Sequence, residues 1–250
     1  SNLGIILKDL DKLKEAELSY RKAIEIKPDF AEAHYNLGII LKDLDKLKEA
    51  ELSYRKAIEI KPDYAEVYSN LGIILKDLDK LKEAEISYRK AIKLKPDFAD
   101  AFFNLSNLEL LIGNYKSGLD NFEFRFKTKK PAITYGETKI ERINNQELQQ
   151  VKKILVISEQ GLGDTLQYMR YVPYLKNLGF NVSFSAQKKL HSLIKASGID
   201  HNPLTPDQST LFAEGQWISL LSLPRILKVT HKNPIVSDPY IFSTEELNQK

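Results

Sequence analysis

Residues 31–64 carry the sequence AEAHYNLGIILKDLDKLKEAELSYRKAIEIKPDY, and residues 65–98 repeat it with few changes. The Leu-Gly pairs Leu3-Gly4, Leu37-Gly38 and Leu71-Gly72 each lie 34 residues apart. The same period holds for an alanine, a tyrosine, a second alanine and a proline in each unit: Ala16, Tyr20, Ala23 and Pro28; Ala50, Tyr54, Ala57 and Pro62; Ala84, Tyr88, Ala91 and Pro96. A period of this length indicates a stacked repeat protein.

Each unit predicts two amphipathic helices. In residues 31–44, Leu37 and Leu41 lie one turn apart on one face, and in residues 48–60 the two alanines and the tyrosine mark a matching face. Gly38 is small at a place where two antiparallel helices must approach closely. Because such a pair cannot bury its apolar face alone, successive units are expected to stack.

Helix ends are also marked in each unit. Asp29 stands three residues before Glu32, and Asp63 three residues before Glu66, which is the pattern of a capping box. A proline before each aspartate ends the preceding helix. These signals predict that the first helix of each unit begins directly after the aspartate.

The period and the order of conserved types within it resemble the tetratricopeptide repeat (TPR), a helix–turn–helix unit. The resemblance implies an α-solenoid, a TPR superhelix over residues 1–127 with units at about 1–30, 31–64, 65–98 and, in degenerate form, 99–127. In the last unit Leu105 keeps its place, Ser106 and Gly118 replace the usual glycine and alanine, and Gly113-Asn114-Tyr115 fits the turn.

An asparagine precedes each Leu-Gly pair or its equivalent, at Asn2, Asn36, Asn70 and Asn104. An amide offers both a donor and an acceptor, so a ladder of asparagines can bind peptide backbone. The pattern is similar to the asparagine ladder in the TPR arm of O-linked N-acetylglucosamine transferase, which implies a peptide or protein partner in the concave groove. Ile39, Ile73, Asp43 and Asp77 are expected to share that groove. The alternative is that these asparagines are solvated or bonded within their own helices.

After a connector expected at 128–152, with a short helix near Gln146–Gln150, the periodicity changes. Residues 154–158 form an apolar, β-branched run typical of a buried parallel strand. Further strands are expected at 181–186 and 216–220, and helices at 165–178, 188–197 and 223–229. This alternation predicts that residues 153–250 are an α/β Rossmann-like half-domain with a mostly parallel sheet.

The residues after the first strand, Ser158-Glu-Gln-Gly-Leu-Gly-Asp-Thr-Leu-Gln167, followed by Arg170-Tyr-Val-Pro173, resemble a heptosyltransferase-like (glycosyltransferase family 9) domain. The resemblance implies the acceptor lobe of a GT-B glycosyltransferase, an arrangement found with TPR arrays in bacteria. It assigns Asp164 as a candidate catalytic base toward a sugar or other hydroxyl acceptor, with Glu159, Gln160, Gly161 and Gly163 as ligand-binding residues. Asp164 could instead be an ordinary helix N-cap before Thr165.

The resemblance covers about residues 150–245, and the chain ends where a donor-binding lobe should begin. We therefore expect no sugar transfer by this chain alone, and whether it belongs to an enzyme stays open. A non-catalytic TPR scaffold with the α/β lobe as a docking domain is the alternative. A nucleotide-dependent oxidoreductase is disfavoured, because only Gly161 and Gly163 of the dinucleotide-binding glycine pattern are present.

Composition narrows the function classes. The chain has 250 residues, 42% hydrophobic and 28% charged, with 37 basic and 34 acidic side chains and a net charge of +3, which disfavours a nucleic-acid binder. No apolar run is long enough for a membrane span. Cysteine is absent and the four histidines are scattered, so no cofactor or metal is expected. A cytoplasmic location is expected; the start at Ser1, inside a repeat, suggests a piece of a longer protein and leaves a lost leader open.

Overall fold

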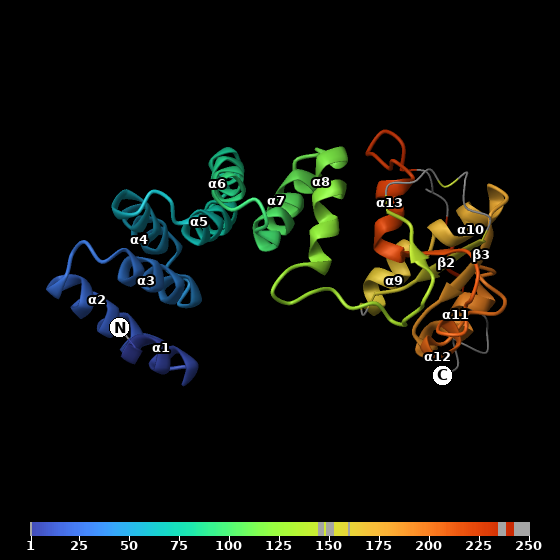
Figure 1. The fold of residues 1–250 in the computed structure, drawn as a ribbon, viewed down its shortest axis with the longest axis horizontal. Coiled ribbons are helices and arrows are strands. Elements are labelled where there is room, and N and C mark those ends of the chain that lie inside the picture. Colours follow the sequence, from blue (N-terminus) through green and yellow to red (C-terminus); the bar gives the residue numbers. More distant parts are fainter. Residues whose placement is uncertain (1, 145–147, 149–152, 160, 235–238, 243–250) are drawn as a thin grey trace. The chain divides into compact units, whose positions relative to one another are not determined.

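The computed structural model describes residues 2–144, 148, 153–159, 161–234 and 239–242. The chain divides into two compact units, the first formed by residues 1–112 with 127–129 and the second by residues 113–126 with 130–250. The first unit is helical, whereas the second contains a small sheet flanked by short helices (Figure 1).

The first unit consists of antiparallel helix pairs, as the repeat predicts. Within each pair the two helices pack together, and each second helix also packs on the first helix of the next pair. The helices are α1 (Asn2–Asp9), α2 (Leu13–Ile26), α3 (Ala31–Asp43), α4 (Leu47–Ile60), α5 (Ala65–Asp77), α6 (Leu81–Leu94) and α7 (Ala99–Leu111). Every helix therefore shares its apolar faces with neighbours in sequence, and the core runs along the unit.

A glycine and a tyrosine fix the distance between the helices of a pair. A Cβ atom on Gly38 would lie 2.5 Å from Cε1 of Tyr54, and one on Gly72 would lie 2.6 Å from Cε1 of Tyr88. Both tyrosine rings are buried. Because a side chain at either glycine would have to displace a buried ring, the Leu-Gly signature marks a packing requirement.

The turn between the paired helices has a residue with left-handed backbone conformation at the same place in each repeat. These residues are Asp11 (φ 57°), Asp45 (φ 60°), Asp79 (φ 59°) and, in the degenerate unit, Gly113 (φ 85°). After α3, the Lys46 N–H donates to the Leu41 carbonyl over 2.8 Å, closing the helix end. The predicted turn at Gly113 therefore follows the geometry of the regular units.

The expected capping boxes do not form. Helix α3 begins at Ala31 with Phe30 as its N-cap, and no side chain caps it; α5 begins in the same way after Tyr64. The aspartates thus stand one residue too early to bond the first turn. The aromatic N-caps lie beneath lysines instead, with the Lys61 ammonium 4.6 Å from the centre of the Tyr64 ring.

Ion pairs join the second helix of each repeat to the next repeat. Glu51 on α4 binds Arg55 of its own helix and Lys80, which directly precedes α6, each at 2.8 Å. Arg55 also binds Glu83 on α6 at 2.6 Å. Equivalent contacts one unit earlier are Glu17–Arg21, Glu17–Lys46 and Arg21–Glu49. Burial alone would raise the pKa of Glu51, but its bonds to Lys80 and Arg55 outweigh burial and lower it.

The second unit contains a four-stranded parallel sheet in the order β1-β4-β2-β3. Its strands are β1 (Glu141–Arg142), β2 (Lys153–Ile157), β3 (Asn181–Ser185) and β4 (Gln216–Ser219). The helical segments are α8 (Tyr115–Phe122), η1 (Glu123–Phe126), α9 (Leu162–Tyr168), α10 (Tyr171–Asn177), η3 (Lys188–Leu190), α11 (His191–Ala196), α12 (Pro206–Ser209), η4 (Leu220–Ser222) and α13 (Leu223–Ile226). The expected parallel sheet is therefore present.

Several boundaries differ from those expected from the sequence. The helix predicted at 165–178 is two helices, α9 and α10, because Pro173 lacks an N–H and its ring clashes with the carbonyl four residues earlier. Strand β1 lies within the expected connector, and the helix expected at Gln146–Gln150 falls mostly outside the described residues. Helix α8 belongs to the second unit rather than to a solenoid extending to 127, since it packs on α13.

We expect Glu51→Gln to lower the free energy of unfolding by about 1 kcal/mol at pH 7, because it removes a largely shielded carboxylate from two cations. The pKa of Glu51 is lowered in the folded state, so its stabilisation is complete above the unfolded value and is lost as pH falls through the folded value. Urea unfolding followed by circular dichroism should therefore show a smaller difference from wild type near pH 3 than at pH 7. Glu59→Gln on the exposed side of α4 is the control; an equal Glu51→Gln effect at both pH values would contradict the prediction.

Candidate functional site

The first helices line the inner side of the first unit. Helix α3 contacts α5, and α5 contacts α7, more closely than the second helices α2, α4 and α6 contact one another. The first helices are therefore on the side where successive pairs converge. Asn36, Asn70 and Asn104 lie on α3, α5 and α7, and each side chain is half-buried. The side chain of Asn2 lies outside the described residues.

One asparagine is held by a neighbouring aromatic side chain. Nδ2 of Asn70 donates to the Tyr35 hydroxyl over 3.1 Å. The Tyr35 ring lies 5.1 Å from the ring of Tyr64. Burial, with smaller effects from Tyr64 and Glu66, raises the pKa of Tyr35 to about 12, so the hydroxyl keeps its proton at neutral pH. The amide of Asn70 therefore has a fixed orientation.

Sequence reasoning missed Tyr35. Its equivalents in the following units are Ser69 and Phe103, so no period marks this position. The available signal was local: an aromatic side chain directly before Asn36, one helix away from the next asparagine of the ladder.

The other residues expected in the groove differ in their surroundings. Ile39 and Ile73 are half-buried and pack against the core of the first unit. Asp43 and Asp77 end their helices in loose ion pairs, with Lys8 at 3.4 Å and with Lys76 at 3.8 Å. Exposed pairs of this kind contribute little to stability, so these carboxylates can exchange partners.

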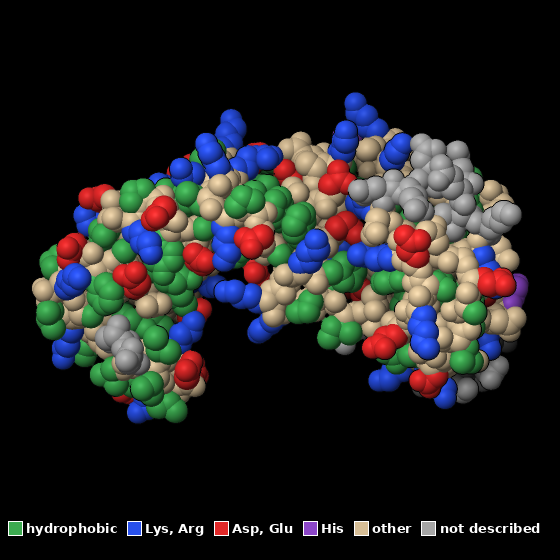
Figure 2. Space-filling model, viewed as in Figure 1, with side chains coloured by type: hydrophobic (Ala, Val, Ile, Leu, Met, Phe, Trp, Pro, Cys, Tyr) green, Lys and Arg blue, Asp and Glu red, His purple; other side chains and the backbone are tan. Residues whose placement is uncertain are grey.

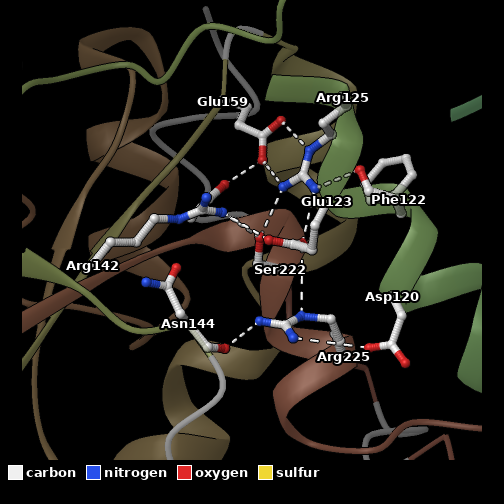
Figure 3. A network of polar contacts seen from close by, with 10 residues as sticks. Asp120, Phe122, Glu123, Arg125, Arg142, Asn144, Glu159, Ser222 and Arg225 are labelled. Carbon is white, nitrogen blue, oxygen red and sulfur yellow. Dashed lines mark hydrogen bonds and ion pairs between the residues drawn. The ribbon is translucent and has the colours of Figure 1, made fainter. Parts of the chain in front are cut away.

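In the second unit, polar side chains meet where the parallel strands end. Glu159 follows β2, Gln187 follows β3 and Ser219 ends β4. The buried carboxylate of Glu159 accepts hydrogen bonds from Nε and Nη2 of Arg125, over 3.0 and 2.6 Å, and a further one from the Ser219 hydroxyl. Figure 3 shows Arg125 reaching this edge from the helical segment at the start of the unit.

Arg125 is itself enclosed. Its guanidinium lies 4.4 Å from the centre of the Phe122 ring and 4.2 Å from that of Phe126. Nη2 of Arg125 also donates to the Ser222 hydroxyl, which donates to Glu123 over 2.7 Å (Figure 3). Burial alone would raise the pKa of Glu123, but the neighbouring arginines and Ser222 outweigh it and lower the pKa.

Glu159 therefore stands at the sheet edge where the sequence places it, but its oxygens face groups of the protein itself. A buried carboxylate requires a paired cation, and Arg125 meets that requirement with two parallel bonds. A ligand hydroxyl at this position would compete with a buried, bidentate ion pair. The structure thus gives Glu159 a structural contact that the sequence did not predict.

Asp164 is not the helix N-cap that the sequence offered as an alternative role for it. Helix α9 begins at Leu162 with Gly161 as its N-cap, so Asp164 lies inside the first turn and is not the cap. Its side chain is exposed and folds back beside Gly161. Gly163 has open space around it, and Gln160 lies outside the described residues. Asp164 is therefore open to solvent at the carboxyl end of β2.

Within the part of the chain that the structure describes, no group of three His, Asp or Glu side chains is placed to hold a metal ion. In the same residues, no helix is both long enough and apolar enough to cross a membrane.

Family models match the helical part of the chain. A model described as "TPR repeat" matches residues 4–45, and one described as "Tetratricopeptide repeat" matches residues 31–64 and 65–98. Residues 4–98 are tetratricopeptide repeats. This TPR segment agrees with the units expected from the sequence. The comparison with curated proteins found no match.

Solved TPR-type structures are similar to the chain over about half its length. MamA is 22% identical, with a TM-score of 0.48 over 52% of this chain and 75% of that one. YrrB, described as a TPR protein with an unusual peptide-binding site, is 23% identical, with a TM-score of 0.46 over 51% of this chain and 66% of that one. The first TPR of Spaghetti (RPAP3), bound to an HSP90 peptide, is 24% identical, with a TM-score of 0.44 over 44% of this chain and 88% of that one.

We expect Arg125→Leu to lower the free energy of unfolding of the second unit by about 3–5 kcal/mol, because it leaves Glu159 buried without a cation. Trp217, the only tryptophan of the chain, lies on β4 and reports this unit by fluorescence during urea unfolding. The double variant Arg125→Leu/Glu159→Leu is the control and should recover most of the loss. A double variant no more stable than Arg125→Leu alone would show that the pair is not the cause.

Proposed function

We propose that the TPR segment is a protein-binding module that holds an extended segment of a partner along its inner face. The observation that carries this proposal is the placement of Asn36, Asn70 and Asn104 at one position on three successive first helices, on the side where these helices converge. All three side chains keep part of their surface exposed. A row of amides at a constant spacing is suited to a partner with a constant repeat, and polypeptide backbone has one.

The spacing fits an extended peptide. Packed helices lie roughly 10 Å apart, which is about three residues of extended chain at ~3.3 Å per residue. Each amide can donate to a carbonyl and accept from an N–H of the same peptide. Because Tyr35 holds one amide hydrogen of Asn70, the remaining groups of that side chain are oriented before the partner arrives.

Binding of backbone rather than side chains has a consequence for specificity. The asparagines themselves would accept many sequences, so selection among partners falls to the neighbouring groups. Ile39 and Ile73 offer apolar surface, and Asp43 and Asp77 offer loosely paired carboxylates. The groove is therefore proposed to favour an extended segment with small apolar and basic side chains.

We expect replacement of Asn36, Asn70 and Asn104 by alanine to weaken peptide binding by tenfold to about a thousandfold, since each hydrogen bond contributes about 0.5–1.5 kcal/mol. The probe is the strongest binder selected from a random peptide library, and the measurement is titration calorimetry. Lys22→Ala, exposed on the second helix α2, is the control. Methylation of the peptide's backbone nitrogens should cause a comparable loss. Unchanged affinity in the triple variant would exclude the asparagine ladder.

A second candidate concerns the second unit, proposed as a glycosyltransferase-like acceptor lobe that acts together with a donor-binding lobe. The observation that favours it is the exposed carboxylate of Asp164 beside Gly161, at the carboxyl end of a parallel strand. Ligands of open α/β sheets bind at this edge. In this interpretation Asp164 accepts the proton of an acceptor hydroxyl while the hydroxyl oxygen bonds to the anomeric carbon of the donor sugar and the nucleotide leaves with the electron pair of the broken sugar–phosphate bond.

The enclosure of Glu159 by Arg125 favours the alternative, in which the second unit is a non-catalytic docking domain that follows the TPR segment in the chain. The two interpretations differ at Asp164. In a transferase lobe Asp164 contacts the acceptor. In a docking domain Asp164 is an acidic residue in the first turn of a helix, and its role is to stabilise the helix by its interaction with the helix dipole.

Nuclear magnetic resonance titration with monosaccharides and nucleotide-sugars separates these interpretations. If the unit is an acceptor lobe, we expect shifts at residues 161–165 that disappear in Asp164→Asn. Asp207→Asn, in the first turn of α12 of the same unit, is the matched control and should leave the shifts unchanged. No shift at about 10 mM sugar, or shifts that persist in Asp164→Asn, would favour the docking domain.

A further inference from the structure

An exposed aliphatic side chain recurs at one position on the helices α2, α4 and α6. These residues are Leu18, Leu52 and Ile86, and each follows the previous one by the repeat period. Leu52 and Ile86 are each 68% exposed, although both belong to repeats with neighbours on either side. The second helices lie away from the inner side, where the first helices converge. The three side chains therefore form a row on the opposite, outer side of the TPR segment.

A hollow lies beside each of the last two members of this row. The aliphatic residues that line the two hollows stand at equivalent positions, one repeat apart: Ile24, Leu37 and Leu52 in the first, and Ile58, Leu71 and Ile86 in the second. Their volumes are about 380 and 470 Å³. Each hollow is therefore large enough to receive an apolar side chain from a partner.

Lysines border the row on both sides. They stand four residues before and four residues after each member, at Lys14 and Lys22, Lys48 and Lys56, and Lys82 and Lys90. All six are exposed, and Figure 2 shows Lys and Arg side chains gathered over α6, next to hydrophobic ones. Lys56 pairs with Glu59, and Lys90 lies 6.0 Å from the centre of the Tyr68 ring at the second hollow. Among the described residues, the other four lysines have no carboxylate partner.

The carboxylates of the outer side do not neutralise these lysines, because most of them are already paired. Glu49 binds Arg21 at 2.6 Å, and Glu83 binds Arg55 at 2.6 Å, in both cases between neighbouring second helices. Glu25, which lines the first hollow, is the exception among the described residues. The outer side therefore combines an apolar row with an excess of positive charge on both of its edges.

We propose that this outer side is a docking surface for an acidic amphipathic α-helix of a partner protein, bound across α2, α4 and α6. Stacked helices lie roughly 10 Å apart, and seven residues of an α-helix span about 10.5 Å. A helix with an apolar side chain at every seventh residue thus presents one to each repeat. Acidic side chains on the two edges of its apolar stripe then face the two rows of lysines.

Two other occupants match the outer side less closely. A membrane surface cannot fill the recessed hollows beside Leu52 and Ile86, whereas the side chains of a helix can. A second copy of this chain, packed through the same side, would bring lysine rows against lysine rows, and like charges across an interface are unfavourable. The proposal is independent of the asparagine ladder, which lies on the inner side.

The probe is a fluorescent peptide made of three copies of Glu-Ala-Ala-Leu-Ala-Ala-Glu, in which alanine favours the helix. Fluorescence anisotropy with the whole chain should show saturable binding that weakens as salt is added. We expect Leu52→Glu/Ile86→Glu to weaken this binding by about tenfold or more, as the loss of central apolar contacts does. Because both side chains are exposed, the variant should melt at the wild-type temperature.

Three controls make the result specific. Leu111→Glu places a charge on an exposed apolar position of the first helix α7 and should leave binding unchanged. A peptide with lysine in place of glutamate should fail to bind wild type but should bind Lys48→Glu/Lys82→Glu, in which two bordering charges are reversed. The triple alanine variant of the asparagine ladder should bind the glutamate peptide as wild type does, which separates the two surfaces.

The proposal is overturned if the glutamate peptide does not bind at about 1 mM, or if Leu52→Glu/Ile86→Glu binds it as wild type does. Equal binding of the lysine peptide to wild type would also overturn it. So would wild-type binding to vesicles of anionic phospholipid, or a wild-type dimer, that is lost in Leu52→Glu/Ile86→Glu, since the outer side would then contact a membrane or a second copy.

Discussion

The contact between a glycine on each first helix and a tyrosine ring on the second sets the spacing of the TPR segment. Because the ring of Tyr54 lies against Gly38, the two helices pack at a fixed distance and angle, and the next pair can only stack in the same way. Asn36, two residues before Gly38, is turned about 200° around the helix from it. The constraint that buries the glycine thus directs the asparagine to the opposite side, where successive first helices converge.

Much of this unit could be predicted from its sequence, because each interaction that forms it lies within about one period. The apolar spacing, the glycine and the left-handed turn residue each recur, and each marks a local requirement. What escaped prediction was a matter of single residues. Phe30, not Asp29, is the N-cap of α3, and Tyr35 orients Asn70 although its equivalents, Ser69 and Phe103, are not tyrosines.

The second unit was predictable only in part. The buried strand β2 is evident from its apolar run, and the break between α9 and α10 follows from Pro173. The bond between Arg125 and Glu159 gave no comparable signal, because a charged side chain ordinarily faces water. Only the fold brings η1 to the end of β2.

The network around Arg125 also has a consequence for the order in which the chain is made on the ribosome. Ser222, a partner of Arg125, follows it by 97 residues, and β1 pairs with β4. At common rates of synthesis that interval lasts roughly 5 to 20 s. A TPR pair, in contrast, is complete soon after its second helix emerges. During that interval the nascent chain carries folded repeats together with an Arg125 whose buried surroundings are incomplete. The segment around Arg125 therefore depends on Ser222 and β4 to become ordered.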